Sequence, residues 1–257
     1  MYKTYSAQDY KRLLGLPQDY KIDGMLIYGT WDQETQVKKL ITTLDNLKIN
    51  YKINNLPDFL IKVLEIEINN KKFWFNVAYG GALLTEFVHL ACLFGSKQNI
   101  LIGSCGGLSE KLNSNTVILP DLSYGDGSTS SMYQREIKNN LYPSNNELRN
   151  QLALELLNNK IKYAVGKTMT CQAMMAETMK DVIKWNKEGY IGVEMEASAV
   201  FSVSNHFGVK SSAMVILSDN LIKEETIASE SYQNLKGVRL NLQNKLYEIS
   251  LQQLINN

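Results

Sequence analysis

Short apolar runs that end in glycine or a polar residue alternate along this chain with segments of helical periodicity. The run Gly24–Gly29 reads Gly-Met-Leu-Ile-Tyr-Gly, and the segment after it places Val37, Leu40, Ile41 and Leu44 on one helical face. The alternation continues through most of the 257 residues. It predicts an α/β fold in a single domain, with a central mixed, largely parallel, twisted sheet and helices on both faces.

The same patterns place the other expected elements along the chain. Strands are expected at 64–68, 73–79, 99–103, 116–122, 161–165, 190–193 and 212–218, and the first two of these form a hairpin around residues 69–72. Helices are expected at 81–94, 145–158, 174–187, 196–207 and 232–254. Residues 1–23 are polar and rich in Tyr, so they are expected to form an N-terminal extension to a domain over 24–257.

Charge and cysteine usage exclude several classes of protein. The chain has 27 Lys and Arg against 26 Asp and Glu, so no excess positive charge predicts binding to nucleic acid or to an anionic membrane. Its three cysteines are widely spaced, which is typical of reduced thiols, and no secretory signal or membrane span is visible. We therefore expect a cytoplasmic protein. His89 and His206 are isolated and ligand-rich spacing is absent, so no metal site is expected.

Functional groups in such sheets gather where the strands end. One strand is expected to break at Gly103 into the turn Gly103-Ser104-Cys-Gly-Gly107, whose backbone N–H groups could face a ligand. A bare strand–turn is the alternative interpretation of this segment.

Two carboxylates and a thioether stand at a second strand end, Gly192-Val193-Glu194-Met195-Glu196-Ala197. Carboxylates accept hydrogen bonds from sugar hydroxyls, and a Met side chain packs on an apolar sugar face. The alternative is an acidic helix N-terminus stabilised by the helix dipole.

A third strand end delivers Ser218-Asp219-Asn220 after an apolar run. An Asp in this position acts either as a helix cap or as a catalytic acid, and the segment alone leaves both open.

These three motifs, in this order and spacing, resemble the nucleoside phosphorylase and nucleosidase superfamily, which includes purine nucleoside phosphorylases, uridine phosphorylases and methylthioadenosine/adenosylhomocysteine nucleosidases. Residues 126–130 with Tyr133 are similar to its ribose-side loop, and residues 166–178 to its base-side strand and loop. The resemblance covers roughly residues 24–222. It implies that 24–257 form a catalytic domain that cleaves the N-glycosidic bond of a nucleoside, with purine favoured, in a homo-oligomer (a dimer or a trimer of dimers).

The resemblance also implies a role for each matching residue. Met195 and Glu196, with Glu194, should hold the ribose, and Asp219 should protonate the leaving base. Gly29, Gly103 and Ser104 should border the nucleophile. The base pocket should be shaped by Thr168, Met169, Thr170, Val193 and Asn220. Such a set suits the reaction, because glycosidic cleavage builds positive charge on the sugar and negative charge on the base.

The chain departs from the phosphorylases where they bind phosphate. The two arginine positions of that family are Gln33 and Leu101 here, and residues 45–60 contain no Arg. Each lost charge-assisted contact costs about 1.5–3 kcal/mol, which favours hydrolysis over phosphorolysis.

In the nucleosidases a Glu after the first strand activates water, and alignment on Gly29 puts Glu34 there as a third catalytic residue. The alternative for this segment is a capping box of Thr30 with Gln33, which leaves Glu34 as a surface acid.

The resemblance implies no cofactor, and phosphate enters as a co-substrate only if the enzyme is a phosphorylase that grips it differently, through Lys167 or Ser104. A non-catalytic nucleoside-binding relative is the remaining alternative.

Overall fold

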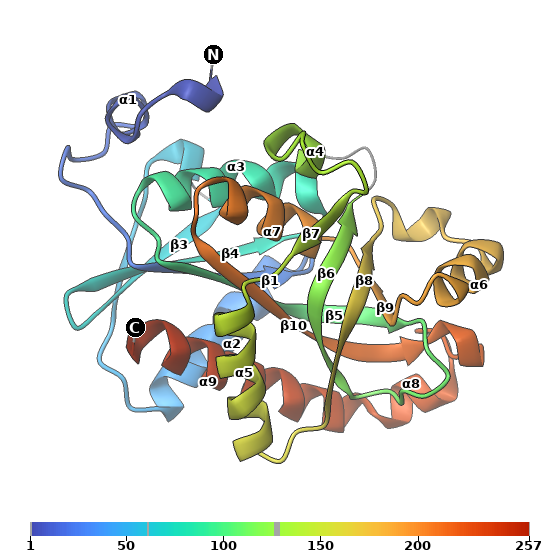
Figure 1. Ribbon diagram of the computed structural model, residues 1–257. Coiled ribbons are helices and arrows are strands. Elements are labelled where there is room, and N and C mark those ends of the chain that lie inside the picture. The colour runs from blue at the N-terminus through green and yellow to red at the C-terminus, as the bar shows by residue number, and fades with distance from the viewer. Residues whose placement is uncertain (1, 61, 126–128, 257) are drawn as a thin grey trace.

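The computed structural model describes residues 2–60, 62–125 and 129–256, which form a mixed sheet between two layers of helices (Figure 1). Its strands are β1 (Gly24–Gly29), β2 (Lys52–Asn54), β3 (Val63–Ile68), β4 (Lys71–Ala78), β5 (Gln98–Gly107), β6 (Val117–Gly125), β7 (Leu141–Pro143), β8 (Tyr163–Thr170), β9 (Gly192–Glu194) and β10 (Lys210–Asn220). Its helices are α1 (Ala7–Leu13), α2 (Gln33–Asn46), α3 (Gly81–Leu93), α4 (Thr129–Tyr133), α5 (Asn146–Asn158), α6 (Met179–Lys187), α7 (Ala197–His206), α8 (Glu230–Asn234) and α9 (Lys236–Asn256), with short 3-10 turns at Tyr2–Thr4, Asp58–Leu60, Met174–Ala176 and Leu221–Lys223.

The sheet closes on itself in its second half. Strand β1 lies between β4 and β5 and is parallel to both. Strand β5 is parallel to β10, β10 is antiparallel to β6, and β6 is parallel to β8. Strand β9 then pairs with β8 and with β5, which completes a ring of five strands, and β1, β4, β3 and β2 extend from it. The predicted mixed α/β sheet is confirmed, and its closure is an additional finding.

Two hydrophobic cores lie on opposite faces of the sheet. Helices α3 and α7 cover one face, and α2, α5 and α9 cover the other (Figure 1). Strand β1 contributes to both, because Met25 and Ile27 point into the first core while Leu26 and Tyr28 point into the second. This alternation explains why β1 is apolar along its whole length, since successive side chains of a strand face opposite sides of the sheet.

The predicted hairpin is present as β3 and β4, and its turn consists of Asn69 and Asn70. Both residues have positive φ, 52° and 62°. Two-residue hairpin turns of type I′ require this conformation, and Asn tolerates it better than most residues do. Gly95, with φ of 101°, ends α3 in the same left-handed region, as its place after the apolar helix predicts.

The glycine-rich segment after Gly103 does not form the expected turn. Strand β5 continues to Gly107, where it pairs with both β9 and β10. The glycines serve close packing instead. A Cβ on Gly106 would lie 2.9 Å from a methyl group of Leu221, and one on Gly107 would lie 2.9 Å from Leu217. Glycine is needed here because neighbouring side chains occupy the space that a side chain would fill.

The C-terminal segment also differs from its prediction. The single helix expected at 232–254 is divided into α8 and α9, with Leu235 as the C-cap of α8.

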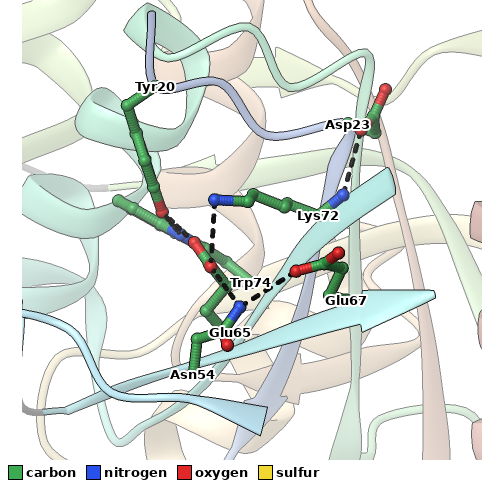
Figure 2. Close-up of polar contacts among 7 residues, drawn as sticks. All are labelled: Tyr20, Asp23, Asn54, Glu65, Glu67, Lys72 and Trp74. Carbon is green, nitrogen blue, oxygen red and sulfur yellow. Dashed lines mark hydrogen bonds and ion pairs between the residues drawn. The ribbon is translucent and has the colours of Figure 1, made fainter. Parts of the chain in front are cut away.

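The segment before β1 is anchored to the body by a buried polar network (Figure 2). The hydroxyl of Tyr20 donates to the buried carboxylate of Glu65 on β3, and accepts from Trp74 Nε1 at 2.8 Å. Glu65 also accepts from Asn54 at 2.9 Å and lies 3.5 Å from Lys72 Nζ. Residues of the segment 2–23 therefore pack against the body of the protein, and Leu14, Leu16 and Ile22 enter the first core.

Candidate active site

A cavity of about 440 Å³ opens at the carboxyl ends of the central strands. Gly29 lines it from β1, Ser104 from β5, Val193 from β9 and Asp219 from β10. Met195 and Glu196 line it from the junction of β9 and α7. The structure thus brings together residues from all three motifs, which lie far apart along the chain.

Glu194 is buried, and five donors within the protein hold its carboxylate. The donors are the backbone N–H groups of Glu196 and Ala197, at 2.7 and 2.6 Å, and the hydroxyls of Thr170, Ser123 and Thr168, at 2.7, 3.0 and 3.3 Å. A carboxylate has about four lone-pair sites. Both oxygens of Glu194 are thus engaged within the protein, and its expected contact with ribose stays a prediction. Its role is to fix the first turn of α7.

Glu196 occupies the N-cap position of α7 and is only 5% exposed. Its Oε1 accepts a hydrogen bond from the backbone N–H of Gly80 at 2.7 Å. Gly29 leaves room for this carboxylate, because a Cβ there would lie 2.6 Å from Glu196 Oε2. Burial, and then the charge of Glu194, raises the pKa of Glu196 to about 8. This carboxyl group therefore titrates close to neutral pH beside the end of β1.

Asp219 is buried beside a bulge in β10. Leu217 pairs with Cys105 and Asp219 with Gly106, so Ser218 is the extra residue. The Ser218 hydroxyl donates to Asp219 Oδ1 at 2.5 Å. Burial raises the pKa of Asp219, although the Ser218 hydrogen bond and the nearby charge of Arg239 act in the opposite direction. The net effect is a raised pKa of Asp219, which is the direction that a carboxyl group needs in order to donate a proton near neutral pH.

Glu34 does not reach the cavity. Its side chain is 81% exposed on the first turn of α2, and its carboxylate pairs with Lys38 at 2.6 Å. The helix begins at Gln33 and its N-cap is Asp32, which accepts from the backbone N–H of Thr35, so the expected Thr30–Gln33 capping box is also wrong. Once α2 begins at residue 33, its second position faces solvent. The structure therefore overturns the general-base role expected for Glu34.

The residues expected in the base pocket divide into three groups. Val193 lines the cavity. Met169 and Thr170 line a neighbouring hollow of about 520 Å³, which shares Glu177 with the cavity.

Thr168 and Asn220 line neither the cavity nor this neighbouring hollow. Thr168 bonds Glu194, and the amide of Asn220 donates to the carbonyls of Ser109 and Leu112 and so fixes the segment after β5.

The remaining expected positions are found as follows. Gly103 packs on the backbone of Gly29, with a Cβ position 3.5 Å from it, and supports the cavity from behind. Lys167, an alternative phosphate contact, donates to the carbonyl of Glu188 and lies 4.8 Å from the Tyr190 ring centre, outside the cavity lining. Of the ribose-side stretch, residues 126–128 lie outside the described residues, and Ser130 bonds Ser198 on α7.

Several lining residues come from segments without a strand-end signal. Met174, from the 3-10 turn after β8, and Tyr232, from α8, line the cavity. Trp31 and Tyr79 stand at its exposed edge, with ring centres 4.9 Å apart in a T-shaped arrangement. Sequence patterns could not place Met174 or Tyr232, because a helix and a 3-10 turn remote from β1 reach the site only through the tertiary fold.

The end of the cavity near Gly29 has neutral polar side chains beside the Glu196 carboxyl group. It is lined by Thr30, Tyr28, Gln36 and Gln243, and Ser104 lies in the same lining. Among the described residues that line the cavity, none is Lys, Arg or His, whereas four are acidic: Glu177, Glu194, Glu196 and Asp219.

Within residues 2–60, 62–125 and 129–256, no cluster of three or more His, Cys, Asp and Glu side chains forms a potential metal centre. No helix in these ranges has the length and apolar character needed to cross a bilayer.

Solved structures share this fold at low sequence identity. The 5′-methylthioadenosine/S-adenosyl homocysteine nucleosidase of Campylobacter jejuni superposes with a TM-score of 0.70 at 13% identity, covering 90% of this chain and 97% of that one. A uridine phosphorylase of Vibrio fischeri gives 0.71 at 15% identity, covering 99% and 98%.

Sequence comparison identifies the family. A purine nucleoside phosphorylase DeoD-type of Clostridium beijerinckii is 27% identical over 140 residues, which cover 54% of this chain and 59% of the relative. A relative of the same description from Actinobacillus succinogenes is 26% identical over 179 residues, covering 69% and 68%. The chain thus spans 59% of the length of the first of these relatives. The family profile described as the phosphorylase superfamily matches residues 81–250, and this chain belongs to that superfamily.

Proposed function

We propose that this protein cleaves the N-glycosidic bond of a purine nucleoside by hydrolysis. The observation that carries the preference for water over phosphate is the charge of the cavity, whose described lining residues include carboxyl groups but no cation. A phosphate anion bound there would lack a positively charged partner among these lining residues. A water molecule is neutral and needs only hydrogen-bonding groups. The preference for purine rests on relatives named as purine nucleoside phosphorylases and an adenosine-type nucleosidase.

Asp219 and Glu196 have complementary tasks in this proposal. Asp219 gives its proton to the base as the bond between the base nitrogen and C1′ breaks. Water attacks C1′, and its proton passes to the Glu196 carboxylate, which takes the part first expected of Glu34. A base whose pKa lies near 8 is well matched to proton transfer close to neutral pH. Met195, which lines the cavity beside Glu196, would pack on the sugar.

The decisive experiment is incubation with a panel of purine and pyrimidine nucleosides, with and without inorganic phosphate. We expect free ribose and free base as products. The rate of their formation should not depend on added phosphate. A saturable requirement for phosphate, with ribose 1-phosphate as product, would replace hydrolysis by phosphorolysis. Binding of every nucleoside without turnover would show a nucleoside-binding protein instead.

A further inference from the structure

A second hollow, of about 380 Å³, lies between α2 and the α8–α9 segment. Three cationic side chains line it, those of Lys39, Lys236 and Arg239. The other lining residues are neutral: Tyr232, Gln233, Leu240 and Gln243. Among the described residues, no carboxylate contributes to this lining or forms an ion pair with any of the three cations. The charge of this hollow is therefore opposite to that of the nucleoside cavity.

Arg239 is the most unusual member of this basic hollow. It is 6% exposed, and its guanidinium stacks on the ring of Tyr232 at 3.7 Å. Its Nη2 donates to the Tyr232 carbonyl at 3.0 Å, but its Nη1 is buried and has no hydrogen-bond partner among the described residues. The charge of Arg239 acts on Asp219 without an ion pair between them, and a buried donor without a partner is costly.

The two lysines add further positive charge to the hollow. Lys236 lies one helical turn before Arg239 on α9, where like charges repel. Lys39 approaches from α2, and its Nζ donates to Gln243 Oε1 at 2.6 Å. Burial lowers the pKa of Lys39, and this effect outweighs the opposite effect of the Asp32 charge, with which Lys39 forms no ion pair among the described residues. An anion would satisfy all three groups at once.

We propose that this hollow binds a small oxyanion, a phosphate or phosphoryl group, between Lys39, Lys236 and Arg239. A phosphoryl group offers several acceptor oxygens, which suits a guanidinium and two ammonium groups. The site is separate from the expected phosphate positions of the phosphorylases, Gln33 and Leu101. None of its three cations lines the nucleoside cavity. The proposed anion is therefore not the nucleophile of the cleavage reaction.

The basic hollow shares a wall with the nucleoside cavity, because Tyr232 and Gln243 line both. Gln243 is held by Lys39 and also bonds Tyr28 at the end of β1. An anion that fixes Arg239 and Lys39 would thus fix one wall of the substrate site. Two sources supply such a group: free inorganic phosphate, or the phosphate of a nucleotide whose nucleoside part occupies the cavity.

Calorimetric titration of the full chain with inorganic phosphate tests the proposal. We expect saturable binding at one site, weakened about tenfold or more in Lys236→Gln and Arg239→Lys. Lys236 is exposed, so its variant folds even if Arg239 cannot be changed. Lys245→Gln removes one charge elsewhere on α9 and serves as the matched control, with affinity unchanged within about twofold. Absence of saturable binding, or equal weakening by Lys245→Gln, would overturn the proposal.

Titration with a nucleoside 5′-monophosphate and with the matching nucleoside separates the two sources. A nucleotide that binds more tightly than its nucleoside, and loses this advantage in Lys236→Gln, identifies the nucleotide phosphate as the ligand. Equal binding of the two, with inorganic phosphate bound alongside either, identifies free phosphate. The binding proposal does not depend on hydrolysis, since it is read from affinity, whereas the proposed function is read from the reaction products.

Discussion

Replacement of Glu196 by Gln should remove a large pH-dependent component of the stability of the ligand-free protein. The fold raises the pKa of Glu196 from its ordinary 4.5 to about 8. Between these values the folded protein keeps a proton that the unfolded chain has released. The group therefore contributes stability that is fully present below pH 4.5 and is lost as the pH rises through about 8.

The size of this effect follows from the pKa. At about 1.4 kcal/mol per pH unit, the whole shift corresponds to about 5 kcal/mol. Integrated from pH 5 to pH 8, the wild-type free energy of unfolding should fall by about 3–4 kcal/mol through this group. Gln resembles the protonated carboxyl in shape and does not titrate, so the free energy of unfolding of Glu196→Gln should not fall in this way. The variant should therefore become more stable relative to the wild type as the pH rises.

Urea denaturation at several pH values between about 5 and 8 measures the difference. Glu177, Glu194 and Asp219 are present in both proteins, so the comparison isolates Glu196. Glu248→Gln, at an ion-paired surface position of α9, serves as a control that should follow the wild type within about 0.5 kcal/mol. Parallel curves for Glu196→Gln and the wild type would refute the claim that burial and Glu194 hold the proton on Glu196.

Four further predictions concern the site and the assembly. Asp219→Asn should lower kcat by about 10²–10⁴-fold for natural nucleosides, but much less for a nitrophenyl riboside, and equal losses on both would indicate a structural role. Glu34→Gln should leave the rate unchanged and alter stability by at most about 0.5 kcal/mol, since the group pairs only with Lys38 on the surface; a large loss of activity would restore its catalytic role. Gly29→Ala should fold but lose about 10²-fold in kcat, because its Cβ would displace the Glu196 carboxylate; unaltered kinetics would show that this carboxylate need not lie there. Sedimentation at micromolar concentration should give at least a dimer with an isologous interface, and an active monomer would contradict this expectation.

The sequence was informative where a local pattern decides the structure. Apolar runs and helical faces predict most of the strands and helices, because side-chain burial has period 2 in a strand and about 3.6 in a helix. The strand-end rule likewise locates Glu196 and Asp219, because functional groups gather where strands end, although β9 runs antiparallel to β5 and β10 parallel to it. The three-residue strands β2 and β7 are too short for such a pattern.

The errors arise where tertiary geometry decides. The position of Glu34 five residues after Gly29 predicts a catalytic role. However, Asp32 caps α2, so Glu34 lies in the first turn of this helix and its side chain points to solvent. The glycines of β5 suggest a turn, whereas Leu217 and Leu221 require their lack of side chains. Closure of the sheet depends on β10 pairing with both β5 and β6, strands separated from it by about 90 residues or more, which no local pattern specifies.

The anchoring of the N-terminal segment has a consequence for synthesis on the ribosome. Tyr20 forms its hydrogen bond only when Glu65, 45 positions later, has been synthesised. Lys3 donates to the carbonyl of Met132, 129 positions later. The contacts of this segment are therefore complete only after residue 132 has been synthesised. Until then Leu14 and Leu16, buried in the finished protein, are exposed on the nascent chain, where a chaperone that binds apolar segments would find them.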